Sequence, residues 1–96
     1  MSQPTAPKLK DVRGTVSFTF DGRKYRVDAV AAGVAGEEEN AYIDIWDFEK
    51  VFEIRPGRNR EIVGEELLKL EGEFACHDYI NDLISGVLTE RWMELS

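Results

Sequence analysis

Cys76, His77 and Asp78 follow one another in this 96-residue chain, and their side chains are of the types that do covalent chemistry. A nucleophilic cysteine usually works with a histidine that removes its proton. Consecutive residues of a helix point about 100° apart, so Cys76 and His77 cannot exchange a proton directly if this segment is helical. His77 is the sole histidine, so no other imidazole base exists. We therefore predict a protein that is not an enzyme, with a buried Cys76 beside a boundary histidine.

A second chemical candidate is a group of carboxylates that could hold a hard cation. Its members are Glu37, Glu38, Glu39, Asp44, Asp47 and Glu49. Their spacing lacks the alternating Asp/Asn positions, the central glycine and the terminal glutamate of a calcium loop. The neighbouring Gly33-Val-Ala-Gly36 lacks the Lys-Ser/Thr of a phosphate-binding loop. We predict no metal site and no cofactor.

Charge is distributed along the chain in four blocks of alternating sign. Residues 1–26 carry six bases and two acids, and residues 27–49 carry seven acids and no base. Residues 50–60 carry four bases and one acid, and residues 61–96 carry nine acids and two bases. The net charge of −7 repels nucleic acid, so we expect no direct nucleic-acid binding.

A surface rich in carboxylates can instead occupy a protein groove that evolved for phosphates. The alternative interpretation of the same acids is a solvated surface that keeps the protein soluble. We predict that the acidic surface contacts a partner protein, through Glu37, Glu38, Glu39, Asp44, Asp47, Glu49, Glu65 and Glu66.

Length and composition favour one domain in a reducing compartment. Ninety-six residues are typical of a single domain. Cys76 has no second cysteine to pair with, and no stretch is long and apolar enough to span a membrane. The first residues contain two prolines and no apolar core of a signal peptide. We predict a flexible N-terminal segment over 1–12, one domain over 13–96, and a cytoplasmic location, which is the host cytoplasm if a phage encodes the chain.

The first elements should form a β-hairpin. From Gly14 to Phe20 apolar and polar residues alternate, as in a half-buried strand. Asp21-Gly22 suits a tight two-residue turn, and the return strand runs from Lys24 to about Ala32. Residues 33–40 show no period and are predicted to be a loop.

The second half of the chain combines further strands with helix. A third strand is predicted from Tyr42 to Arg55, with a turn or bulge at Asp47, and a short fourth strand at 60–63 after Pro56-Gly57. From Gly64 the apolar period becomes helical, and its phase changes near Gly72, which predicts a kink or break between 71 and 76. Residues 89–95 suit a last helical turn or a short strand. The fold class is α+β: an antiparallel sheet of three to four strands with a C-terminal, kinked helix on one face.

The order of these features resembles a known class of proteins. A DGRKYRV hairpin, an acidic loop, a YIDIWDFEKVFEI strand and an EELLKLEGEF helix succeed one another over residues 14–85. This order is similar to small phage-encoded accessory proteins of β-β-β-α layout, among them anti-CRISPRs and other anti-defence inhibitors. The resemblance implies action by stoichiometric binding and supplies no site residue.

Three hypotheses follow from the sequence. The first is an inhibitor that binds a host or viral protein, as a nucleic-acid mimic or otherwise. The second is a structural or regulatory protein of a phage or mobile element that self-associates into a homo-oligomer through Trp46, Phe48, Phe52 and Trp92. The third is a small enzyme built on Cys76 and His77. The missing catalytic set and the segregated charge favour the first.

Overall fold

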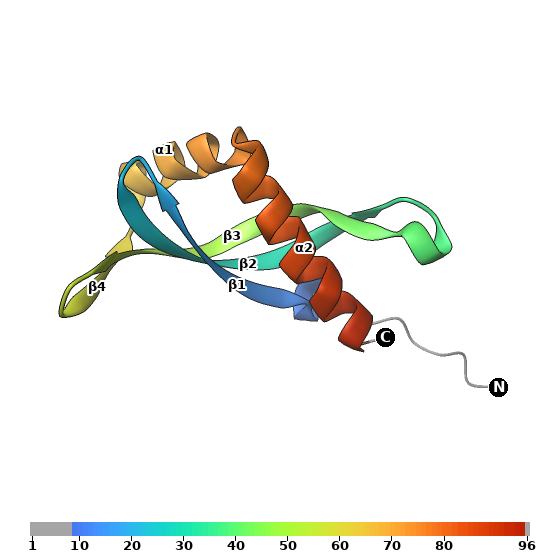
Figure 1. The fold of residues 1–96 in the computed structure, drawn as a ribbon. Coiled ribbons are helices and arrows are strands. Elements are labelled where there is room, and N and C mark those ends of the chain that lie inside the picture. The colour runs from blue at the N-terminus through green and yellow to red at the C-terminus, as the bar shows by residue number, and fades with distance from the viewer. Residues whose placement is uncertain (1–8, 96) are drawn as a thin grey trace.

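A computed structural model describes residues 9–95, apart from the side chain of Glu38, and shows an α+β fold (Figure 1). A 3-10 turn, η1, precedes a four-stranded antiparallel sheet in the order β1-β2-β3-β4. A second 3-10 turn, η2, joins β2 to β3, and two helices follow the sheet. The bounds are η1 Leu9–Asp11, β1 Arg13–Phe20, β2 Arg23–Ala35, η2 Glu38–Asn40, β3 Tyr42–Arg55, β4 Arg58–Ile62, α1 Gly64–Ala75 and α2 Asp78–Leu95.

The β1–β2 hairpin forms as the sequence predicts. Asp21 and Gly22 both have positive φ, 52° and 76°, the conformation that a primed two-residue turn requires. The pairing Val16↔Val27 and Phe18↔Tyr25 places the large apolar residues of both strands on one face. That face is buried, and the alternate residues point to the opposite side of the sheet.

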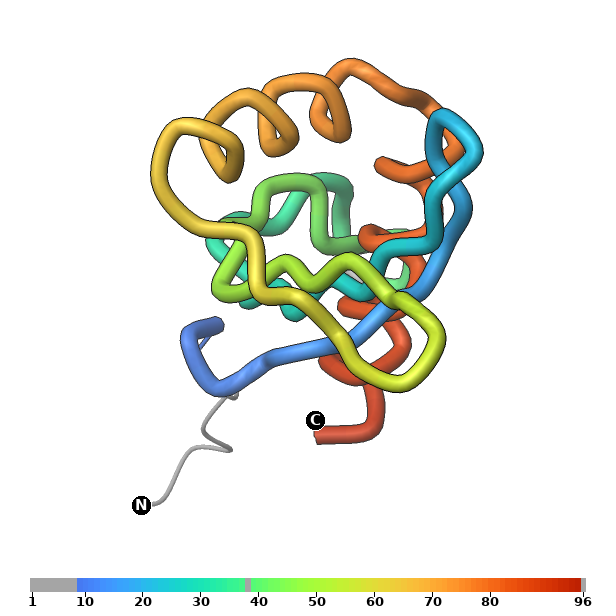
Figure 2. The backbone as a smooth tube through the Cα atoms, turned by 90° about the vertical axis from the view of Figure 1, so that its left-hand side faces the viewer, coloured from blue at the N-terminus to red at the C-terminus, as the bar shows by residue number. Residues whose placement is uncertain are grey.

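Both helices cover this apolar face. Leu70 and Phe74 of α1, with Ile80, Ile84 and Leu88 of α2, join the strand residues in one core. α1 stands over one end of the sheet, and α2 crosses the strands diagonally (Figures 1 and 2). The apolar stripes of the two amphipathic helices thus pack on the apolar face of the sheet.

The predicted kink is a complete break between two helices. α1 ends at Ala75, and the amide of Asn81 then donates to the carbonyl oxygens of Ala75, at 2.7 Å, and His77, at 2.9 Å. The Asn81 side chain thus satisfies the carbonyl of Ala75, which the break leaves without a helical partner, whereas the carbonyl of His77 also accepts the backbone N–H of Asn81. Residues 89–95 belong to α2, which decides between the two predicted alternatives.

Three boundaries differ from the prediction. β2 continues through Gly33 to Ala35, because residues 33–35 pair with β3 although their sequence is typical of a loop. β3 has one register shift at Glu49, between the pairs Asp28↔Lys50 and Ala29↔Phe48, and another at Asp44, between Gly33↔Ile45 and Val34↔Ile43, whereas Asp47 pairs with Val30. Residues 9–12 of the predicted flexible segment pack against the sheet: Val12 is fully buried, and its carbonyl accepts a bond from the N–H of Ala31. Residues 1–8 of the predicted flexible segment lie outside the described residues.

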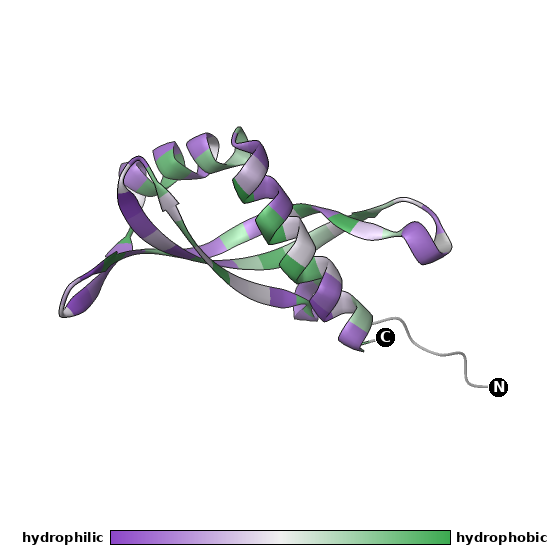
Figure 3. Ribbon diagram, viewed as in Figure 1, coloured by the Kyte–Doolittle hydropathy of each residue, from purple (hydrophilic) through white to green (hydrophobic). Residues whose placement is uncertain are grey.

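The molecule is elongated, and its two tips have opposite charge. Its principal extents are 52 × 24 × 22 Å. The outer part of the β2–β3 hairpin projects at one end, and the β3–β4 turn projects at the other (Figure 1). Both tips are hydrophilic (Figure 3), but the first carries glutamates and the second carries Arg55 and Arg58. An acidic segment and a basic segment of the sequence therefore lie at opposite ends of the elongated molecule.

Candidate protein-binding surfaces

The projecting end of the β2–β3 hairpin, residues 33–45, exposes apolar side chains beside carboxylates, and we call it the acidic hairpin. Val34 is 41% exposed, Tyr42 46% and Ile45 57%. Val34 pairs with Ile43 and Tyr42 pairs with Ala35 at consecutive positions, so the side chains of Val34 and Tyr42 lie on opposite faces of the hairpin. Glu37, Glu39 and Asp44 of the same hairpin are also exposed, and none has an ion-pair partner among the described residues. Large apolar side chains exposed together on a projecting segment are typical of a surface that meets a partner.

The acidic hairpin is held in place at its base. Thr89 of α2 accepts a hydrogen bond from the N–H of Ile43 at 2.9 Å, and the Ser85 hydroxyl donates to the carbonyl of Ile43 at 2.6 Å. These bonds use both backbone groups of a residue on the strand edge that β4 does not reach. At the tip, Gly36 has a φ of +83°, and a Cβ there would lie 2.7 Å from the carbonyl oxygen of Asn40. The hairpin is thus shaped by its own backbone and docked on α2.

The eight predicted contact residues do not form one surface. Glu37 and Glu39 lie at the tip of the acidic hairpin, and Asp44 and Asp47 are exposed along β3. The side chain of Glu38 lies outside the described part of the chain. Glu49 forms an ion pair with Arg13 at 3.2 Å.

The remaining two, Glu65 and Glu66, begin α1 beside β4, towards the basic tip. Glu66 accepts a bond from Arg60 at 2.8 Å. The structure therefore brings together the acids of the hairpin and separates them from those of α1.

A network of ion pairs joins β3, β4 and α1 at the basic end. Glu53 is buried, and its Oε1 accepts hydrogen bonds from Arg55 and Arg60, both at 3.0 Å. Arg60 also donates to both oxygens of Glu66. The hydrogen bonds from Arg55 and Arg60 hold the pKa of Glu53 below its ordinary value, and the bond from Arg60 lowers the pKa of Glu66. This network anchors the start of α1 to the sheet.

The lowered pKa values predict a loss of stability in acid. A carboxyl whose pKa is lower in the folded state stabilises the fold above its unfolded pKa, and that contribution disappears as the pH falls through the folded pKa. We expect the difference in unfolding free energy between the wild type and Glu53→Gln, measured by urea denaturation, to be largest at neutral pH. It should shrink below the ordinary glutamate value of 4.5. Glu61→Gln, at an exposed position of β4, is the control, and parallel pH curves for wild type and Glu53→Gln would contradict the prediction.

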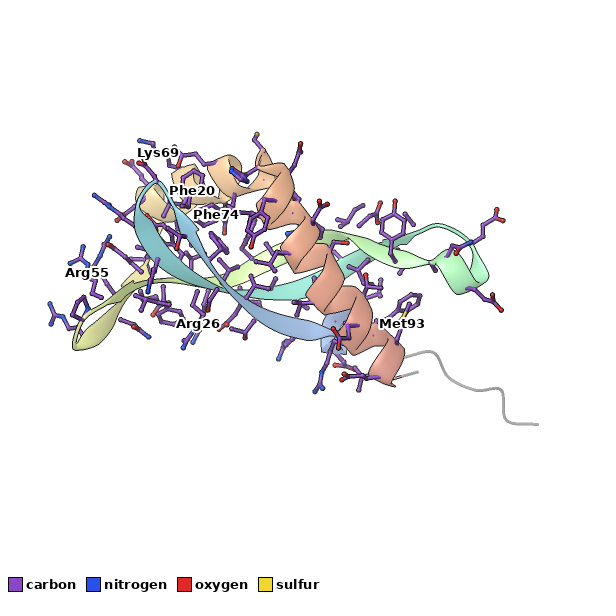
Figure 4. All side chains as sticks on the ribbon, in the orientation of Figure 1. Phe20, Arg26, Arg55, Lys69, Phe74 and Met93 are labelled. Carbon is purple, nitrogen blue, oxygen red and sulfur yellow. The ribbon has the colours of Figure 1, made fainter. Side chains whose placement is uncertain are left out.

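No element within residues 9–95 covers the side of the sheet away from the helices (Figure 1), and we call this side the open face. The register aligns two rows of side chains across its strands: Thr19, Lys24, Ile54 and Asn59 in one, and Ser17, Arg26, Phe52 and Glu61 in the other. The guanidinium of Arg26 lies over the ring of Phe52, 4.5 Å from its centroid. Figure 4 places Arg26 on the side of the sheet opposite α1.

Cys76 and His77 lie at the break between the helices. The prediction of a buried Cys76 is wrong: its side chain is exposed, because the break turns it away from the apolar stripes of α1 and α2. His77 is also exposed, and its ring meets the edge of Phe20 at a centroid distance of 5.8 Å. Within residues 9–95 there is no group of three or more His, Cys, Asp or Glu side chains placed to hold a metal ion.

The surface also has a shallow cavity of about 210 Å³ between the β1–β2 turn and α1. It is lined by side chains of mixed charge, among them Arg23, Glu66 and Lys69. Neither helix of the described chain is both long and apolar enough to cross a membrane. Comparison of the sequence with protein-family models and with curated proteins, and of the fold with solved structures, found no match.

Sequence reasoning missed several residues of these surfaces. Val34 lies in the segment that the sequence predicts to be a loop, and the contact between Arg26 and the ring of Phe52 depends on the pairing of β2 with β3. In the sequence, nothing distinguishes Glu53 from an exposed charged residue of a strand. Its burial becomes recognisable when β4 is paired with β3 so that Arg60 stands opposite Glu53.

Proposed function

We propose that this protein is a non-enzymatic binding module whose acidic hairpin inserts into a complementary site on a partner protein. The observation that carries the proposal is the exposure of Val34, Tyr42 and Ile45 on a projecting hairpin that also exposes carboxylates. Exposed aromatic and aliphatic side chains next to charged ones have the composition of protein interfaces. The partner site is correspondingly apolar at its centre and basic at its rim.

The biological setting that fits this mode of action is stoichiometric inhibition. A domain of this size blocks a host protein by occupying a functional surface, as the phage-encoded accessory proteins that the sequence resembles are thought to do. In the nucleic-acid-mimic form of this proposal, all eight carboxylates would contact the partner together. The ion pairs of Glu49 and Glu66, and the separation of α1 from the acidic hairpin, favour a local contact through the hairpin.

The test is site-specific photo-cross-linking in lysate of the host. A photoreactive phenylalanine analogue replaces Tyr42 in one sample and Tyr79, a more exposed tyrosine of α2, in another. We expect an adduct of defined mass from position 42 that position 79 does not give. Identical adducts from both positions, or none from position 42, would contradict the proposal.

Charge reversal then tests the electrostatic part of the contact. The variant Glu37→Lys, Glu39→Lys, Asp44→Lys should lose the adduct, and high salt should weaken it in the wild type, because exposed charges are screened. The matched control reverses Glu73, Asp82 and Glu90, exposed acids of the helices, and changes the net charge equally. Loss of the adduct in both variants would assign the effect to net charge and not to the hairpin.

A further inference from the structure

The open face carries cations that nothing in the described part of the chain neutralises. Lys24 and Arg26 have no hydrogen-bonded or ion-paired carboxylate among residues 9–95, whereas the neighbouring Asp28 already accepts a bond from Thr15 at 2.9 Å. The Nε of Arg26 is buried and has no hydrogen-bond partner there. A buried donor without a partner is costly, so this guanidinium is suited to an added acceptor.

Apolar side chains stand beside these cations. Phe52 lies under Arg26, and Ile54 stands next to Lys24 in the cross-strand row. Both apolar residues are half-buried, although no element of the fold covers this face. The open face therefore offers positive charge next to apolar surface.

The acidic hairpin has the complementary composition. It combines exposed apolar groups with Glu37, Glu39 and Asp44, all exposed and without ion partners in the described chain. Within one copy the two surfaces cannot meet. Nine residues of β2 separate Arg26 from Ala35 at the outer end of the strand, roughly 30 Å at the usual rise of a strand. A contact between them requires a second molecule.

We propose that the open face binds the acidic hairpin of a second copy of this chain. The carboxylates of one copy then face Lys24 and Arg26 of the next, and the apolar side chains of the hairpin lie on Phe52 and Ile54. The contact is heterologous, so it repeats head to tail and builds either an open chain or a closed ring of copies. Self-association uses the surface that the proposed function gives to the partner, and the two compete.

This surface differs from the aromatic set that the sequence suggested for self-association. Trp46, Phe48 and Trp92 are partly buried against the core, which leaves Phe52 as the one member of that set on the open face. The proposed contact between copies therefore depends on the Arg26 guanidinium over the Phe52 ring and not on a cluster of aromatic side chains.

Sedimentation velocity of the purified full chain tests the proposal. We expect the wild type to associate with rising concentration at low salt and to dissociate at high salt. A face variant, Lys24→Glu with Arg26→Glu, and a hairpin variant, Glu37→Lys with Glu39→Lys and Asp44→Lys, should each raise the dissociation constant by more than about tenfold. Circular dichroism verifies that each variant is folded, and Lys24→Glu alone serves if Arg26→Glu unfolds the sheet.

Mixing the two variants gives the decisive result. The negative hairpin of the face variant fits the positive face of the hairpin variant, and the reversed pair is complementary as well. An equimolar mixture should therefore associate although neither variant does so alone. A wild type that stays monomeric at low salt, or a mixture that stays monomeric when the wild type associates, overturns the proposal. Failure here leaves the photo-cross-linking result of the proposed function unaffected.

Discussion

Replacing Phe74 by alanine is expected to lower the free energy of unfolding by about 3–5 kcal/mol, a large share of the stability of a small domain. Phe74 has no exposed surface, and it is the residue of α1 at the centre of the core. Four rings surround it, with centroid distances of 5.0 Å to Phe18, 5.3 Å to Phe20, 5.4 Å to Tyr25 and 6.4 Å to Phe48. The loss removes the buried area, the edge-to-face contacts to β1 and β2, and a tilted ring contact to β3.

The substitution of Phe74 also weakens the attachment of α1 to the sheet. Besides Phe74, which Figure 4 labels, Leu70 is the sole buried residue of α1, so the substitution removes the larger of the two buried side chains that fix this helix to the sheet. Thermal and urea denaturation measure the result, and the melting temperature should fall by roughly 15–30 °C. Leu68→Ala on the same helix is the control, because Leu68 is 70% exposed and should change the unfolding free energy by less than about 0.5 kcal/mol. Equal effects of the two substitutions would show that α1 does not depend on Phe74.

The sequence predicts this core well, because its signals are local. Asp21-Gly22 determines the first hairpin, and the alternation on either side of it gives the register and the buried face. The phase change near Gly72 predicts the end of α1 within a few residues. In each case the residues that carry the pattern are close neighbours along the chain.

The surfaces are less predictable, because they depend on pairing between distant residues. The sequence predicts a loop over Gly33, Val34 and Ala35. These residues form a strand because they pair with residues 42–45 of β3. Likewise, the burial of Glu53 follows from its position opposite Arg60. The acids of residues 37–49 and 65–66 have one sign in the sequence, but β3 leads the chain to the basic tip, and the short strand β4 has only begun to return from it when α1 begins. The sequence therefore gives the number and sign of these charges but not their positions in the fold.

The second large effect is expected at Tyr42. If the acidic hairpin binds its partner with Tyr42 at the centre of the contact, Tyr42→Ala should weaken binding by about 2 kcal/mol, roughly 30-fold. The affinity for the partner identified by cross-linking is measured by titration calorimetry. The melting temperature should stay close to that of the wild type, because the ring is 46% exposed and belongs to no aromatic contact of the core.

Tyr79→Ala is the matched control for this prediction, since it removes the same side chain from a position that is 62% exposed on α2. It should leave the affinity unchanged. Equal losses from both substitutions would mean that tyrosine surface in general, and not the hairpin, contributes to binding. A loss confined to Tyr42 but accompanied by a lower melting temperature would instead indicate that the hairpin had lost its docking on Ser85 and Thr89. Affinity and stability measured on the same pair of variants therefore separate recognition by the acidic hairpin from its support by α2.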